Sequence, residues 1–223
     1  MSLIVYTFDW LPEFPRGFVR DLRVRWALEE IGRPYEVATV PLSPKSDEHR
    51  GMQPFGQVPM IRDGELTLFE SGAILLHLSD GTPLLPAHRR AEVIQWLIAA
   101  LNSVEITSSV WMEMTMAERM PDVFGSPSTP EAIEHARQNM NGKLDALEKL
   151  MTDRNWIAGT FTAADIMMVD VLRIPQSWDQ LNNYPALTDY VDRATARPAF
   201  RKAMADHMAH WQAADRARRG ASA

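Results

Sequence analysis

The stretch Gln53–Gly81, QPFGQVPMIRDGELTLFESGAILLHLSDG, decides the fold of this chain. Its first half predicts a β-hairpin, because short apolar strands over Val58–Ile61 and Leu66–Phe69 flank the turn dipeptide Asp63-Gly64. Its second half predicts a helix that begins near Ser71, carries apolar residues at helical spacing and ends at the Gly-Thr-Pro sequence that follows. A hairpin therefore leads directly into the first turn of a helix.

A polar pair, Glu70-Ser71, stands where the hairpin meets the helix. The first N–H groups of a helix carry partial positive charge, so they can bind a carboxylate with the Ser71 hydroxyl as a further donor, while Glu70 can bind an ammonium group. Pro59 removes a donor from the first strand, which leaves the Val58 backbone free to pair with an extended peptide. These features predict a small peptide ligand with an α-amino acid head. The alternatives are an edge-strand proline and a plain N-cap serine.

The composition limits the partners and the chemistry. The chain has 223 residues, of which 46% are hydrophobic, enough for a substantial core. A net charge of -6 and a pI near 5.5 disfavour nucleic acid as a partner. We see no apolar run of transmembrane length and no secretion signal, so we expect a cytoplasmic protein that does not bind membranes. The sequence contains no cysteine, which excludes disulfides and a protein thiol nucleophile.

Two domains are expected. Strands over Leu3–Phe8 and Tyr35–Val40 flank a helix that starts at Arg16, and the hairpin and second helix follow. This order predicts an α/β domain with a mixed four-stranded sheet. A segment rich in glycine and proline comes next, and the rest of the chain shows helical periodicity without a convincing strand. The expected domains are residues 1–80, a linker over 81–88, and an all-helical domain over 89–223.

A second informative stretch predicts a helix N-terminus in the helical domain. Thr162 and Asp165 have the spacing of a capping box, and Phe161 and Ile166 can form the accompanying hydrophobic staple. We therefore assign Asp165 a structural role rather than that of a catalytic acid.

These motifs resemble those of the glutathione transferase superfamily. The sequences FGQVP over Phe55–Pro59 and ESGAI over Glu70–Ile74 are similar to its glutathione-binding half, and the same capping box occurs in its helical domain. The resemblance covers nearly the whole chain. It implies a glutathione transferase fold, with a thioredoxin-like N-terminal domain, a cis Val58-Pro59 bond and an all-α C-terminal domain.

The resemblance also implies which residues bind glutathione. The Val58 backbone pairs with the cysteinyl part of glutathione, and Glu70 and Ser71 hold the γ-glutamyl end. The full set of implied glutathione-binding residues is Gln57, Val58, Pro59, Glu70 and Ser71. Lys45 and His49 are weaker candidates for the glycyl carboxylate.

The chain departs from the family where the glutathione thiol is activated. A free thiol has a pKa of about 8.5, so a hydroxyl donor or a nearby cation is needed to ionise it at neutral pH. The aligned position at which serine-type relatives carry that hydroxyl holds Phe18. The remaining catalytic candidates are Tyr6, Thr7 and Arg16, and strand alternation lets only one of Tyr6 and Thr7 face the site. A core role for Tyr6 is the alternative.

Arg16, Arg20 and Arg23 recur at helical spacing on one predicted face. Cations near a helix N-terminus oppose the helix dipole, which favours an anion such as a thiolate or a glutathione carboxylate beside Arg16 or Arg20. The alternative is a solvated basic face that pairs with nearby carboxylates.

Aromatic and thioether side chains are candidates for a pocket that holds an apolar electrophile, because thioethers adapt to varied shapes. The candidates are Trp10, Trp111, Met112 and Met116. The alternative for the residues of the helical domain is a place in the core or in a subunit interface.

The resemblance implies conjugation of the glutathione thiolate to a small hydrophobic electrophile, with glutathione as a substrate and no metal. One alternative is a non-catalytic protein of this fold that acts through protein partners, which Phe18 favours. The other is a glutathione-dependent isomerase. The family also implies a homodimer that pairs through the long first helix of the helical domain.

Overall fold

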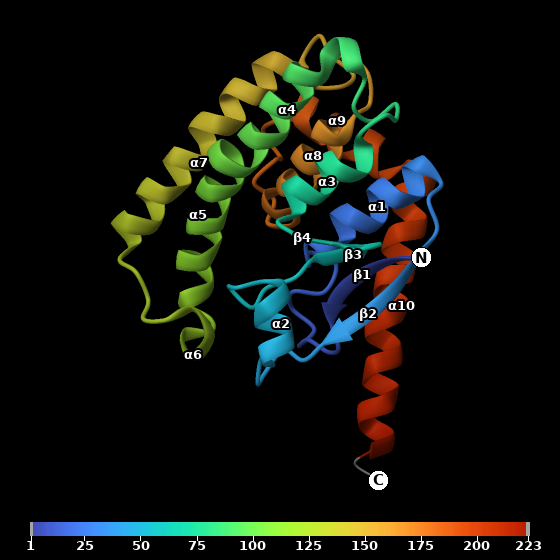
Figure 1. The fold of residues 1–223 in the computed structure, drawn as a ribbon. Coiled ribbons are helices and arrows are strands. Elements are labelled where there is room, and N and C mark those ends of the chain that lie inside the picture. Colours follow the sequence, from blue (N-terminus) through green and yellow to red (C-terminus); the bar gives the residue numbers. More distant parts are fainter. Residues whose placement is uncertain (1, 222–223) are drawn as a thin grey trace. The chain divides into compact units, whose positions relative to one another are not determined.

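The computed structural model describes residues 2–221. These residues form two compact units (Figure 1). The first unit combines the segment up to Ala87 with the segment from Thr195 onward, and the second is His88–Ala194. The last helix therefore groups with the first unit, whereas the sequence placed it in the helical domain.

A mixed four-stranded sheet forms one layer of the first unit, with the strand order β2-β1-β3-β4. β1 is parallel to β2 and antiparallel to β3, and β3 is antiparallel to β4. The strands are β1 (Leu3–Phe8), β2 (Tyr35–Val40), β3 (Met60–Asp63) and β4 (Leu66–Phe69). The predicted sheet is confirmed, but β3 begins at Met60 rather than Val58, because Pro59 has no N–H to donate to a ladder.

The helices of the first unit are α1 (Asp21–Ile31), α2 (Asp47–Met52), α3 (Ser71–Ser79) and α10 (Pro198–Ala221). The helix predicted from Arg16 begins at Asp21 instead, because the chain before it forms turns: the Phe18 N–H donates to the Pro15 carbonyl, and Gly17 has a φ of +85°. α2 lies in a stretch that the sequence predicted to be irregular.

Helix α10 packs against α1, and Figure 1 shows α1 next to the upper part of α10. The rings of Trp26 and Phe200 meet edge to face with their centroids 4.8 Å apart. Further along α10, the Nε2 atom of His210 lies 2.9 Å from the Phe8 carbonyl oxygen. These contacts join residues from opposite ends of the chain, and helical periodicity carries no information about them. This is why the sequence grouped α10 with the helical domain, whereas the compact units group it with the sheet.

The first half of α1 is completely buried, including its charged residues Asp21, Arg23 and Arg25. The Arg25 Nε atom lies 2.8 Å from an Asp21 carboxylate oxygen, and His207 of α10 approaches the same oxygen at 3.3 Å. The alternative of a solvated basic face is therefore wrong for Arg23, because α3 and α10 both contact α1 and exclude water from it.

The second unit is helical, which confirms the predicted all-α C-terminal region. The helix predicted to start at Arg89 is observed as a continuous path with a π-helical turn in its middle. The helices are the 3-10 helix η1 (Ala87–Arg89), α4 (Arg90–Ala99), the π-helix η2 (Ala100–Glu105), α5 (Ile106–Ala117), α6 (Pro121–Phe124), α7 (Pro130–Met151), α8 (Ala163–Ser177) and α9 (Pro185–Thr195).

The predicted capping box at the start of α8 is present. The Asp165 carboxylate accepts hydrogen bonds from the Thr162 N–H at 2.8 Å, the Ile157 N–H at 2.8 Å and the Tyr190 hydroxyl at 2.8 Å. Burial raises the pKa of Asp165 above its ordinary value, although these donors oppose the rise. The bonds tie α8 to α9 and to the segment before α8, which is a structural role.

The helical segment Ala87–Ala117 is long and apolar enough to cross a membrane by length and composition alone. A single helix that meets this criterion is weak evidence for a membrane span. Core helices of soluble proteins meet it as well, and both α4 and η2 contact α8 within the second unit.

Candidate functional site

The hairpin register brings the two predicted ligand-binding motifs to the same end of the sheet. Met60 of β3 pairs with Phe69 of β4. The chain that precedes Met60 and the chain that follows Phe69 therefore leave the hairpin together. Val58-Pro59 and Glu70-Ser71 are these flanking segments, and they are neighbours because of the antiparallel pairing.

The segment before β3 is held by α2. The peptide bond between Val58 and Pro59 is cis, and both side chains are buried. The N–H of Gln57 donates to the Gln53 side-chain oxygen at 3.2 Å, and the Gln57 carbonyl oxygen lies 2.9 Å from His49 Nε2. The Gln57 side chain itself is exposed, so α2 fixes its backbone and leaves its amide in solvent.

Lys45 and His49 contact backbone carbonyls of this same segment. The Lys45 ammonium donates to the Gly56 carbonyl oxygen, and burial lowers the pKa of Lys45. His49 is completely buried. In the structure both side chains hold the loop in front of Pro59.

Glu70 has an unusual backbone conformation at the N-cap of α3. Its φ of 69° and ψ of 114° lie outside the regions that residues with a Cβ normally occupy. Such strain costs about 1–3 kcal/mol, and it concentrates at functional positions. The Glu70 carbonyl accepts the Ile74 N–H at 2.9 Å, and its side chain is exposed. This conformation starts the helix at Ser71 and keeps the Glu70 carboxylate in solvent.

Ser71 opens α3 with its side chain turned inward. It is 4% exposed, and its Oγ atom accepts a hydrogen bond of 3.2 Å from Nη1 of Arg23. Helical spacing alone did not predict this contact of Arg23, because it also fits a solvated face. The apolar neighbours of Arg23 in the sequence were the available signal that this part of α1 is buried.

The two hydroxyl candidates at the end of β1 have different surroundings. Tyr6 is 8% exposed and belongs to an apolar cluster that includes Val58 and Met60, with the Arg62 guanidinium over its ring. Thr7 is completely buried, and its hydroxyl has no hydrogen-bond partner among the described residues. Of the two, Tyr6 therefore lies with the segment that the sequence predicted to bind the cysteinyl part of glutathione.

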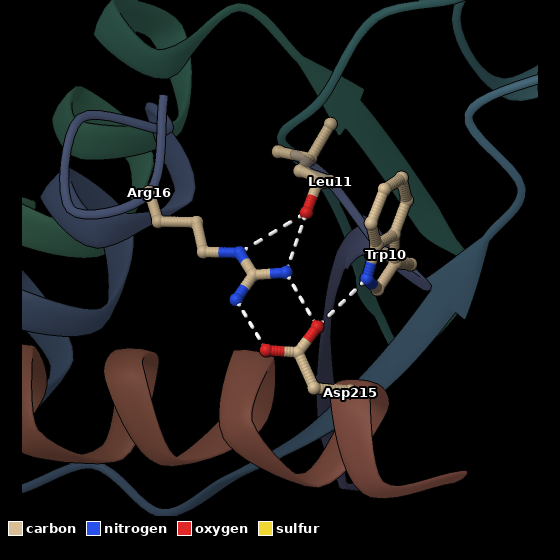
Figure 2. A network of polar contacts seen from close by, with 4 residues as sticks. All are labelled: Trp10, Leu11, Arg16 and Asp215. Carbon is tan, nitrogen blue, oxygen red and sulfur yellow. Dashed lines mark hydrogen bonds and ion pairs between the residues drawn. The ribbon is translucent and has the colours of Figure 1, made fainter. Parts of the chain in front are cut away.

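Arg16 and Trp10 are tied to the C-terminal helix rather than to an open site (Figure 2). Two nitrogens of the Arg16 guanidinium donate to the Asp215 carboxylate at 2.6 and 2.7 Å, and two donate to the Leu11 carbonyl oxygen. Trp10 Nε1 donates to the same carboxylate at 2.9 Å, and Arg218 lies over its ring. The hydrogen bonds from Arg16 and Trp10 hold the pKa of Asp215 well below its usual range.

This network corrects the interpretation of Arg16. The anion that Arg16 meets in the structure is a carboxylate of the chain itself, and that carboxylate lies 199 residues further along. Sequence spacing suggested partners in the neighbouring residues, and it gave no sign that α10 returns to the β1–α1 loop. Phe18 lies half-buried in the turn before α1.

The three candidates for the electrophile pocket on α5 differ in their burial. Trp111 is 4% exposed with its ring against that of Trp178, and Met116 is 3% exposed. Both lie in the core of the second unit, where α5 packs on α7, as the alternative interpretation proposed. Met112 is half-buried and remains available on the helix surface.

The sequence matches the glutathione S-transferase N-terminal domain over residues 15–80 and the glutathione S-transferase C-terminal domain over residues 110–198. A relative from Arabidopsis thaliana, glutathione S-transferase F11, is 30% identical over 73% of this chain and 80% of its own. The chain belongs to the glutathione S-transferase family. Probable glutathione S-transferase GSTF1 from Oryza sativa subsp. japonica is 26% identical over 81% of this chain and 88% of its own.

Solved structures of glutathione transferases share the fold. A glutathione transferase family member from Pseudomonas fluorescens pf-5, crystallised with two glutathione bound, has a TM-score of 0.75, 25% identity and coverage of 91% of this chain and 92% of that one. Glutathione transferase F7 from Populus trichocarpa has a TM-score of 0.77 at 22% identity, with coverage of 93% and 99%, and this likeness concerns the fold alone.

Proposed function

We propose that this glutathione S-transferase family member binds glutathione at the end of the β3–β4 hairpin and conjugates its thiolate to a small hydrophobic electrophile. The observation that carries the proposal is the register that places Val58-Pro59 beside Glu70-Ser71. One segment offers backbone groups outside the β1–β3 ladder, and the other offers the first N–H groups of a helix.

The cysteinyl part and the γ-glutamyl end of glutathione each have matching groups in this arrangement. The Val58 backbone pairs with the cysteinyl part, with Pro59 fixing the direction of the chain and Gln57 beside it. The γ-glutamyl carboxylate binds the N-terminus of α3 together with the Ser71 hydroxyl, and the exposed Glu70 carboxylate binds the ammonium group. The charges are complementary at both contacts.

We propose Tyr6 as the donor that activates the thiol. A hydroxyl that donates to a thiolate lowers the pKa of the thiol. Tyr6 packs with Val58, whereas strand alternation turns Thr7 to the other face of the sheet. Arg16 already binds Asp215 and is assigned to the support of the loop instead.

A second candidate function follows from Phe18. The serine-type position carries no hydroxyl, which favours a glutathione-binding protein of this fold that does not conjugate. A glutathione-dependent isomerase uses the same thiolate as conjugation does, and product analysis separates the two.

Ultraviolet thiolate absorbance during a glutathione titration across pH tests the proposal, because it reports binding and ionisation together. We expect the pKa of bound glutathione to fall by about one unit or more from its free value. We expect the Tyr6→Phe variant to lose most of that shift, with Thr7→Val as the matched control that keeps it. Binding without a shift contradicts catalysis and supports the second candidate.

We also propose a homodimer, supported by an exposed apolar stripe on α4 and α5. Ile98, Ile106 and Val110 are 45%, 57% and 41% exposed, which is unusual for large aliphatic side chains at helical spacing. Sedimentation velocity is expected to show a dimer that the Ile106→Lys variant converts to a monomer. The control is Val123→Lys, because Val123 is 65% exposed but lies on α6. A monomer in the unaltered protein contradicts this proposal.

A further inference from the structure

Arg23 of α1 contacts the first turn of α3 from the protein interior. The side chain projects from α1, which contacts α3, and is only 1% exposed. Its Nη1 atom lies 3.2 Å from Ser71 Oγ in a buried hydrogen bond. A guanidinium therefore contacts, from the protein interior, the hydroxyl of the residue that opens α3.

The chemistry of the two groups fixes the direction of this hydrogen bond. A guanidinium has five N–H donors and no acceptor, whereas a serine hydroxyl has one hydrogen and two acceptor lone pairs. Ser71 Oγ must therefore accept from Arg23. The single Ser71 hydrogen cannot point at Arg23, and it remains available for a different acceptor.

Hydrogen-bond donors lie next to the Ser71 hydroxyl at the start of α3. The N–H groups of the first helical turn have no partners within the helix, and they belong to the same end of α3 as the Ser71 hydroxyl. Without Arg23, the hydroxyl could turn its hydrogen toward a backbone carbonyl and present a lone pair to the ligand, since serine side chains in helices often make such bonds.

We propose that Arg23 is a positioning residue that holds the Ser71 hydroxyl as a donor to the α-carboxylate of the γ-glutamyl group of glutathione. This inference rests on the proposed function, which places that carboxylate at the N-terminus of α3. Arg23 does not touch the ligand and acts through the Ser71 oxygen. It therefore determines specificity for a carboxylate at this end of the ligand.

The test compares glutathione with 4-aminobutanoyl-cysteinyl-glycine, a peptide that lacks only the α-carboxylate. Calorimetric titration of the unaltered protein is expected to show glutathione binding about tenfold or more tightly than this peptide, which is the size of a charge-assisted hydrogen bond. In Arg23→Gln, whose amide can accept from Ser71, the ratio is expected to fall to about threefold or less. Arg23→Lys keeps a side chain that can only donate, so it is expected to retain most of the ratio.

A double-variant cycle separates positioning from structural support. If Arg23 acts through Ser71, the Arg23→Gln substitution lowers the ratio of the two peptide affinities when Ser71 is present. The same substitution leaves that ratio unchanged in a protein that already carries Ser71→Ala. Two results overturn the role of Arg23 and leave the proposed function intact. In one, Arg23→Gln weakens the binding of both peptides equally. In the other, the effects of Arg23→Gln and Ser71→Ala on the affinity ratio are additive. Absence of glutathione binding by the unaltered protein overturns both.

A measurement on the unaltered protein covers the case in which Arg23→Gln does not fold. The ¹⁵N side-chain resonances of Arg23 are expected to shift when glutathione binds and to stay in place when the decarboxylated peptide binds. Identical shifts with both peptides contradict the proposal.

Discussion

The hairpin end of the candidate site and the β1–α1 loop are built in different ways. At the hairpin end, β3, β4 and α3 follow one another in the chain, and the pairing of Met60 with Phe69 is enough to align the two motifs. In the loop, Trp10 and Arg16 are held by Asp215 of the last helix. The difference teaches that the hairpin end is built by residues close together in the sequence, whereas the conformation of the loop depends on a contact between distant residues.

The largest effect is expected at the hairpin end. Ser71→Ala removes a donor to the ligand carboxylate, so the dissociation constant of glutathione is expected to rise about tenfold to a hundredfold. Ser79→Ala is the matched control, because Ser79 is a buried serine at the other end of the same helix. If calorimetry finds that the two variants change the dissociation constant of glutathione equally, the carboxylate does not bind at the Ser71 end of α3.

A smaller effect is expected from the strained residue. Glu70 has a φ of 69°, which glycine adopts without steric cost, so Glu70→Gly is expected to be more stable than Glu70→Ala by about 1 kcal/mol. Both variants lose the contact with the ammonium group, and both are expected to bind glutathione up to about fivefold more weakly. Urea denaturation of the pair checks the first expectation, and an alanine variant as stable as the glycine variant contradicts it.

The smallest effect on binding is expected from the loop. Asp215→Asn breaks the ion pair with Arg16. Glutathione affinity at neutral pH is expected to change less than about twofold, because Asp215 shares no interaction partner with the residues proposed to bind glutathione. A large loss of affinity would show that the hairpin end depends on α10. Asp206→Asn is the control, since Asp206 is an exposed residue of the same helix that pairs with Lys202.

The same ion pair predicts a pH dependence. The pKa of Asp215 is lower in the folded protein than the value of about 3.9 for an unfolded chain. The stabilisation is therefore present above about pH 4 and is lost as the pH falls toward the folded pKa. Thermal unfolding between about pH 5 and 2 is expected to show a shallower loss of stability in Asp215→Asn than in the unaltered protein. Parallel curves would mean that the pair contributes nothing measurable.

The same contrast explains what the sequence could predict. The strands, the hairpin, the start of α3 and the Thr162 capping box follow from turn residues, apolar alternation and capping chemistry, which act over a few residues. The partner of Arg16, the burial of Arg23 and the place of α10 depend on tertiary packing. No periodicity within α1 or α10 encodes which helix covers the other, so these features needed the structure.

A crystal structure of the protein with glutathione tests the central claim most directly. The account predicts the γ-glutamyl carboxylate within hydrogen-bond distance of Ser71 Oγ and the first N–H groups of α3. It also predicts that the cysteinyl backbone pairs with Val58 and that Arg16 stays bound to Asp215. Glutathione with its γ-glutamyl carboxylate on Arg16, or bound away from the hairpin end, would contradict the account.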